Sequence, residues 1–257
     1  MKRLLEEFDR SGQVIMLPWT SMYELTKGGG DNFLASARWI ARRPDAVAVA
    51  RAAMTWFQTV EEPFGTLTAD VTDRMSTKNL RSTLTLVRDG QLSGSEVRDG
   101  YADLSEKARV LVQGSNFRVL FEAGASALAN ELASDEKNKI KSAALKGNRD
   151  PYREWLLRIF TIERLHTFLV SVRIRYVRAR RLANMPSFAA LQVMASLMVS
   201  FRWLLFGGLE STKKSLDNDG IDIENVLIAL YGRDFISEDV CARNLYDDLR
   251  EMAARLW

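Results

Sequence analysis

Three acidic residues stand where a strand end would meet a helix start. Glu24 follows the apolar run at residues 14–17 by about two helical turns. Asp222 opens an apolar helical run, and Asp239 follows the short apolar run at residues 234–236. The carboxyl ends of strands gather at one edge of an open α/β sheet, where oxygen ligands can hold Mg²⁺ or Mn²⁺. Acids from separate segments can therefore meet there and form a metal site.

Each of these acids also fits a second interpretation, that of a helix cap. Ser21 and Glu24 match the capping box S-x-x-E, in which the glutamate satisfies the amide of the N-cap residue. Asp222 and Asp239 both fit ordinary N-cap positions. For each acid considered alone, the role of a helix cap is favoured at least as strongly as a role in catalysis.

The counts of cysteine and histidine restrict the chemistry to carboxylates. The chain has 257 residues with one cysteine, Cys241, and one histidine, His166. These two residues can form neither an internal disulfide nor a Cys/His zinc site, and His166 lies in an apolar helical run typical of a core residue. The sequence contains no P-loop, G-x-G-x-x-G or G-x-S-x-G motif, so nucleotide hydrolysis, dinucleotide redox and serine hydrolase chemistry have no support.

The net charge of +3 hides two segments of opposite sign. Residues 153–185 contain eight arginines and two glutamates, whereas residues 210–251 contain eleven acids and five bases. Arg175, Arg178 and Arg181 are spaced by three, which places them near one helix face and predicts a surface that contacts phosphates. The alternative is a solvated face whose arginine stems cover apolar neighbours.

The apolar periodicity predicts a mostly α-helical protein with a small parallel β-sheet. Strands are expected at residues 14–17 and 234–236, a loop at 217–220, and a polar linker or surface excursion at 66–100 with turn signals at Asp89-Gly90 and Asp99-Gly100. Helices are expected at residues 3–10, 20–28, 33–42, 45–59, 101–113, 117–133, 151–183, 187–206, 222–231 and 239–256.

The N-terminal sequence is charged throughout and lacks the apolar region of a secretory signal, so we predict a cytoplasmic location. Residues 187–209 are apolar enough to raise the question of whether they form a membrane-spanning helix. Their longest charge-free part, residues 187–201, is too short to span a bilayer. We therefore expect a buried helix there and no membrane association.

Two segments resemble the PIN-like nuclease family. Residues 14–27 combine an apolar strand that ends in proline with a helix that contains a glutamate, and residues 222–239 run from an aspartate-led helix into D-F-I-S-E-D. The resemblance covers about residues 1–60 and 210–257. It implies a PIN-like core formed by residues 1–65 and 210–257, with residues 66–209 as a large helical insertion.

The resemblance also implies a function and a set of site residues. A PIN-like domain binds one or two Mg²⁺ or Mn²⁺ ions and cleaves RNA or single-stranded nucleic acid, and the resemblance implies the role of a toxin or defence effector as one setting for that activity. Glu24, Asp222 and Asp239 would be the catalytic metal ligands, and Ser237 a polar residue of the pocket. The candidate nucleic-acid contacts, which no family motif specifies, are Arg38, Arg42, Arg43, Arg175, Arg178 and Arg181.

One departure from the family leaves alternatives open. PIN-like domains begin with a strand that carries an aspartate, and this sequence has no such strand before its first predicted helix. Either the sequence starts downstream of that strand, or Asp70, Asp73 or Asp219 substitutes, or cleavage has been lost. The alternative functions are a helical scaffold that packs against itself or a partner chain, and a nucleic-acid-binding protein that uses Arg173 to Arg181.

Overall fold

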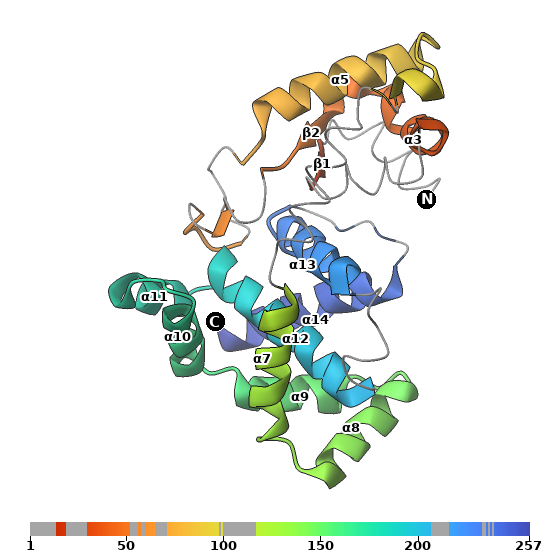
Figure 1. Cartoon of the computed structure of the whole chain (residues 1–257). Coiled ribbons are helices and arrows are strands. Elements are labelled where there is room, and N and C mark those ends of the chain that lie inside the picture. The colour runs from red at the N-terminus through yellow and green to blue at the C-terminus, as the bar shows by residue number, and fades with distance from the viewer. Residues whose placement is uncertain are drawn as a thin grey trace. The chain divides into compact units, whose positions relative to one another are not determined.

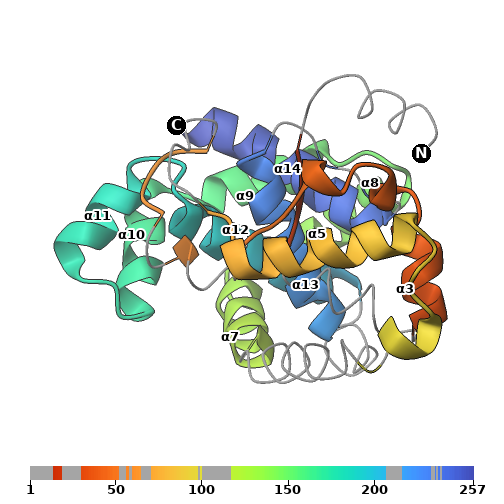
Figure 2. The same ribbon diagram turned by 90° about the horizontal axis from the view of Figure 1, so that it is seen from above.

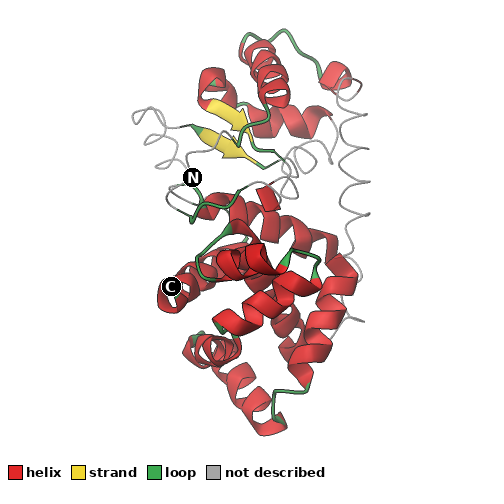
Figure 3. Cartoon of the chain, turned by 90° about the vertical axis from the view of Figure 1, so that its left-hand side faces the viewer, coloured by secondary structure: helices red, strands yellow, loops and turns green. Residues whose placement is uncertain are grey.

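A computed structural model describes residues 14–18, 30–51, 56–57, 60–64, 71–97, 99, 117–206, 216–232, 235, 237 and 239–257. The described residues are mostly helical and contain a small sheet of two parallel strands, as the periodicity predicts (Figure 3). The helices predicted at residues 3–10, 20–28 and 101–113 lie outside the described residues.

The chain divides into two compact units at positions that differ from the predicted boundaries. The first unit combines residues 1–53 and 69–115, and the second combines residues 54–68 and 116–257. The predicted C-terminal part of the core, residues 210–257, therefore falls in the same unit as the helical middle of the chain.

The first unit contains the parallel sheet. β1 (Ile15–Leu17) pairs with β2 (Val47–Val49), and α3 (Gly30–Ala37) lies between them along the chain. Short 3-10 helices at Ile40–Arg42 and Pro44–Ala46 lead into β2. The strand predicted at residues 14–17 is confirmed.

The prediction of a helix at residues 45–59 is wrong for residues 47–49, which form β2. The segment A-V-A-V-A favours a helix through its alanines, but its valines are β-branched and every residue of β2 is buried. Pairing with β1 outweighs the alanine preference, because the strand gains a ladder of hydrogen bonds together with complete burial.

One helix covers the sheet, and it corrects the prediction of a linker at residues 66–100. α5 (Arg74–Arg88) begins at Asp73, whose side chain accepts a hydrogen bond of 2.9 Å from the Ser76 amide. Only Leu80 and Leu84 of this polar helix are buried, and that narrow stripe packs on β2. The predicted turn that follows is confirmed, with Gly90 at φ 67°.

The second unit is built of helices around α12 (Phe188–Phe206), as the two views in Figures 1 and 2 show for its neighbours α7 and α13. The other helices are α7 (Phe117–Ala129), α8 (Ser134–Leu145), α9 (Asp150–Ile159), α10 (Ile162–Ser171), α11 (Tyr176–Ala183), α13 (Leu216–Leu230) and α14 (Val240–Leu256).

α12 confirms the helix predicted at residues 187–206. It is long and apolar enough to cross a membrane by length and composition, and 72% of its most apolar window is buried inside the protein. Phe188, Leu191, Met194 and Phe201 are fully buried, and Trp155 stacks on Phe201 with ring centroids 4.0 Å apart. This burial is the pattern of a core helix.

Three segments of the second unit differ from what the sequence predicts. The single helix predicted at residues 151–183 is three helices, because Thr161 caps α10 and Arg173 adopts a left-handed conformation. The apolar periodicity predicts no helix at α8, because its residues are mainly charged, polar or alanine and only Ile140 is buried. The loop predicted at residues 217–220 lies inside α13, where Asp219 and Gly220 are buried.

The segment at residues 56–64 packs on the second unit. Trp56 is fully buried, with its ring centroid 5.3 Å from that of Phe188 and 5.7 Å from that of Tyr231. The Tyr231 hydroxyl donates a hydrogen bond of 3.0 Å to the Glu62 carbonyl. These aromatic contacts explain why residues 54–68 belong to the helical unit although their neighbours in sequence belong to the other.

Gly124 allows α7 to approach α12 closely. A Cβ atom at Gly124 would lie 2.7 Å from the Ser200 Oγ and 3.1 Å from the Leu197 Cδ2. We expect Gly124→Val to lower the free energy of unfolding by about 1–3 kcal/mol because α12 must shift, even though valine suits a helix better than glycine. Ala127→Val on the exposed side of α7 is the control in urea unfolding. Equal stability of the two variants would show that this helix pair is not tightly packed.

Candidate nucleic-acid interface

The acids of the predicted metal site lie in different local settings. Glu24 lies outside the described residues. Asp222 was predicted to open a helix, which is wrong: α13 begins at Leu216, and Asp222 is half-buried within it. Asp239 is exposed and is the N-cap of α14, where its Oδ1 accepts hydrogen bonds from the amides of Cys241, at 2.6 Å, and Ala242, at 3.1 Å.

The surroundings of Asp239 also differ from the predicted strand end. Phe235 is not part of a strand, while Asp234 and Ile236 lie outside the described residues. The Ser237 hydroxyl accepts a hydrogen bond of 3.1 Å from the Asp239 amide, so this serine extends the cap. The local chemistry of Asp239 is that of a helix start.

Two of the acids considered as substitutes also have structural partners. Asp73 caps α5, and Asp219 is buried, where it pairs with Arg202 and accepts a hydrogen bond of 2.8 Å from the Trp203 indole. Asp70 lies outside the described residues. No three carboxylate, histidine or cysteine side chains gather into a ligand set in the described part of the chain, so these residues do not fit a metal ion. The Mg²⁺ or Mn²⁺ site stays a prediction.

The predicted arginines of the first unit lie just after α3. Arg38 and Arg42 are exposed, and Arg43 is half-buried with its Nη2 4.0 Å from the Asp45 Oδ2. All three lie in the short segment that leads to β2. Their role as nucleic-acid contacts stays a prediction.

The predicted arginine ridge of the second unit is divided by an acid from a distant part of the chain. The Arg178 Nε lies 2.9 Å from the Glu61 Oε1, and Arg181 pairs with the other oxygen of the same carboxylate. Both arginines therefore hold the segment at residues 56–64 on the helical unit. Arg175 precedes α11 and stays on the exposed side.

α10 and α11 form a helical hairpin with an unusual turn. Val172 ends α10, and the next residue, Arg173, has φ 68°. The Ile174 amide donates to the Leu169 carbonyl at 3.1 Å and the Arg173 amide to the Val170 carbonyl at 2.9 Å, which is the Schellman pattern. The left-handed residue of this pattern is usually glycine, because a side chain there is strained. The presence of an arginine in spite of this strain therefore suggests a functional role for its guanidinium group.

The turn and α11 present an exposed surface of five residues, which we name the α11 face: Arg173, Arg175, Tyr176, Val177 and Arg180. Tyr176 is 60% exposed and Val177 is 81% exposed. The rings of Tyr176 and His166 pack edge to face, with centroids 4.5 Å apart. The His166 Nε2 is buried and has no hydrogen-bond partner among the described residues. His166 thus supports Tyr176 from α10.

The arginines of the α11 face have no ion-pair partner in the described part of the chain. None of its residues pairs with the guanidinium groups of Arg173, Arg175 or Arg180. The sequence from residue 164 to residue 209 contains no acid. Within the described residues, the face therefore combines three cations that have no acidic partner with an exposed aromatic ring.

We expect Arg173→Gly to raise the free energy of unfolding by about 1 kcal/mol, because glycine adopts the left-handed conformation without strain. Arg173→Ala removes the same guanidinium but keeps the strain, so its stability should stay near that of the natural sequence. Thermal unfolding of both variants provides the measurement. If the alanine variant gains as much stability as the glycine variant, backbone strain at this turn is negligible.

Periodicity could indicate arginines on one face but could not distinguish paired from free ones. Glu61 lies more than a hundred residues from its two partners, and no local pattern connects them. Arg173 and Arg180 were the residues that the three-residue spacing missed, although both belong to the same arginine-rich stretch. No protein-family model, curated protein or solved structure matches this chain.

Proposed function

We propose that this protein binds RNA or single-stranded nucleic acid through the α11 face. The observation that supports this most directly is the set of three arginines around the exposed Tyr176 that have no partner among the described residues. Guanidinium groups bind phosphate oxygens in a bidentate manner and also stack on bases, which suits them to this role better than lysines.

The shape of the surface favours a single strand over a duplex. Tyr176 and Val177 offer an aromatic ring and an apolar patch, on which an unpaired base can stack, whereas the bases of a duplex are already stacked on each other. α11 has 8 residues and is about 12 Å long, which suits a contact with a few nucleotides. The interaction is therefore expected to be short and tolerant of sequence.

Fluorescence anisotropy with a labelled RNA of mixed sequence tests the proposal. Binding through three phosphate contacts predicts that log K falls against log salt concentration with a slope of about −2, from about 0.7 per contact. A duplex of the same sequence should bind more weakly than the single strand. A flat response to salt, or no binding at low salt, would remove this function.

Metal-dependent cleavage of the bound strand is a second candidate function. It is favoured by the β1–α3–β2 arrangement of the first unit, because parallel strands joined through a helix begin a Rossmann-like sheet. In that case the resemblance to PIN-like nucleases would extend to both the fold and the activity of the protein. The described acids do not gather into a ligand set, so this candidate depends on Glu24 together with acids outside the described residues.

Incubation of the protein with labelled RNA and Mn²⁺ tests cleavage, with Glu24→Gln and Asp239→Asn as variants. Asparagine is as good an N-cap as aspartate, so Asp239→Asn removes the charge while keeping α14 capped. Cleavage that is lost in both variants would support the nuclease. Absence of cleavage, or cleavage that both variants retain, would reject these acids as catalytic and leave binding as the function.

A further inference from the structure

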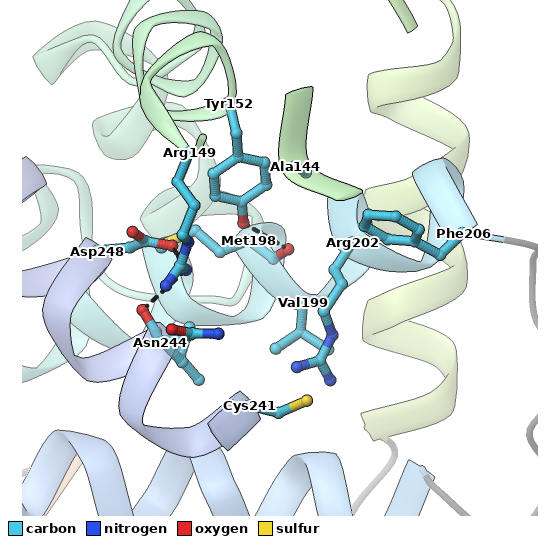
Figure 4. A pocket seen from close by; sticks show the side chains of 11 residues that line it. Ala144, Arg149, Tyr152, Met198, Val199, Arg202, Phe206, Cys241, Asn244 and Asp248 are labelled. Atoms are coloured by element: carbon cyan, nitrogen blue, oxygen red, sulfur yellow. Dashed lines mark hydrogen bonds and ion pairs between the residues drawn. The ribbon is translucent and has the colours of Figure 1, made fainter. Parts of the chain in front are cut away.

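A cavity of about 170 Å³ lies among α8, α9, α12 and α14 in the second unit. Figure 4 shows Arg202 reaching into it from α12, with Cys241 at the start of α14 on the opposite side. Arg149 and Tyr152 come from the start of α9. The predicted acids and the α11 face do not line this cavity, so it is a separate candidate site.

Arg202 keeps binding capacity that the protein does not use. One of its nitrogens, Nη2, pairs with Asp219, and among the described residues its other two nitrogens have no partner. Burial lowers the pKa of Arg202, but Asp219, Cys241 and Tyr152 together raise it by more, so the net change is upward and the group stays charged. The side chain is 30% exposed, which leaves the guanidinium accessible from the cavity.

The charges that line the cavity do not balance. Arg149 and Arg202 are cationic, and Asp248 is the acid among the described lining residues. Both oxygens of Asp248 are already used, one by Arg149 and the other by Arg153 at 2.7 Å. Asp219 pairs with Arg202 from outside the lining. No acid among the described lining residues is therefore left for the other two nitrogens of Arg202.

The rest of the wall is apolar or uncharged. Met198, Val199, Phe206 and Leu245 supply hydrocarbon surface. Burial raises the pKa of Tyr152 to about 12, so the phenol stays neutral, and its hydroxyl donates to the Met198 carbonyl at 3.2 Å. A dry cavity of about 150 Å³ is large enough for a benzene molecule, which sets the size of a suitable ligand body.

We propose that this cavity binds a small monocarboxylate whose apolar body is about the size of one ring. The carboxylate would pair with the two unused nitrogens of Arg202, and the body would lie against Met198, Val199 and Phe206. A single negative charge suits a guanidinium group that already gives one of its nitrogens to Asp219, and a planar carboxylate fits the guanidinium fork.

Cys241 provides a reporter at the site, because it lines the cavity and is the single cysteine of the chain. Benzoate is the probe, and the rate at which uncharged N-ethylmaleimide modifies Cys241 is the readout, together with isothermal titration calorimetry. Benzamide has the same shape without the charge, and acetate has the charge without the ring. We expect benzoate to slow the modification of Cys241 and to bind at least tenfold more tightly than either control compound.

Arg202→Met should weaken benzoate binding at least tenfold, and Arg250→Met, which removes an exposed arginine of α14, should leave it unchanged. If Arg202→Met does not fold because Asp219 loses its partner, Arg202→Met combined with Asp219→Asn removes both charges. Ala144→Leu narrows the cavity and keeps both arginines, and it should weaken binding as well. No binding of benzoate at about 10 mM, or equal binding of benzoate and benzamide, would overturn the proposal.

Discussion

Replacing Asp248 by alanine is expected to lower the free energy of unfolding by about 3 kcal/mol, because Arg149 loses its carboxylate partner inside the second unit, whereas Arg153 keeps Glu251 and Asp150. Asp248 is 1% exposed and pairs with both Arg149 and Arg153. Loss of one partner of a buried pair costs about 3–5 kcal/mol, and we expect the lower end because the two arginine side chains are 25% and 19% exposed.

Asp247→Ala is the matched control for this prediction. It removes the same charge from the adjacent position of α14, where the side chain is exposed, and should change the stability by less than about 0.5 kcal/mol. Denaturant unfolding followed by tryptophan fluorescence suits the measurement, since Trp155 and Trp203 lie in the core of this unit. If both variants lose the same amount, the loss reflects net charge and the buried network contributes little.

The sequence predicts elements well where local signals agree with burial. The helix predicted at residues 239–256 is α14, and the apolar run of α12 is a core helix, as predicted. The prediction fails where contacts between distant residues determine the structure. β2 looks helical until it is paired with β1. α5 looks like a linker because only two of its residues are buried, while Thr77 and Arg81 hydrogen-bond to the backbone of β2.

The prediction of the metal site from the sequence is limited for a similar reason, because an aspartate can serve two different purposes. An aspartate before a helix can bind a metal or cap the helix, and the sequence pattern is identical. In the structure the Asp239 Oδ1 accepts hydrogen bonds from two backbone amides, and Asp222 lies within a helix. The role of either residue as a metal ligand stays a prediction. Sequence spacing likewise could not reveal that Glu61 occupies two of the arginines.

The distinction between paired and free arginines leads to the largest functional effect that we expect. Arg178 and Arg181 are held by Glu61, whereas Arg173, Arg175 and Arg180 can reach a phosphate without breaking a protein contact. Breaking an ion pair costs part of what a new phosphate contact provides. The nucleic acid should therefore bind first through the free set.

Replacing Arg173, Arg175 and Arg180 together by glutamine should weaken RNA binding about 100-fold at about 0.1 M salt and lower the salt slope by about 2, since three counterion-releasing contacts disappear. The control removes the same number of charges from exposed positions outside the hairpin: Arg243→Gln, Arg250→Gln and Lys139→Gln. Both variants have the same net charge. A uniform attraction of the basic chain for RNA would weaken them equally, whereas a site at the α11 face requires loss in the first variant alone. Equal affinities, measured by anisotropy across a salt series, would place the binding surface elsewhere on the protein.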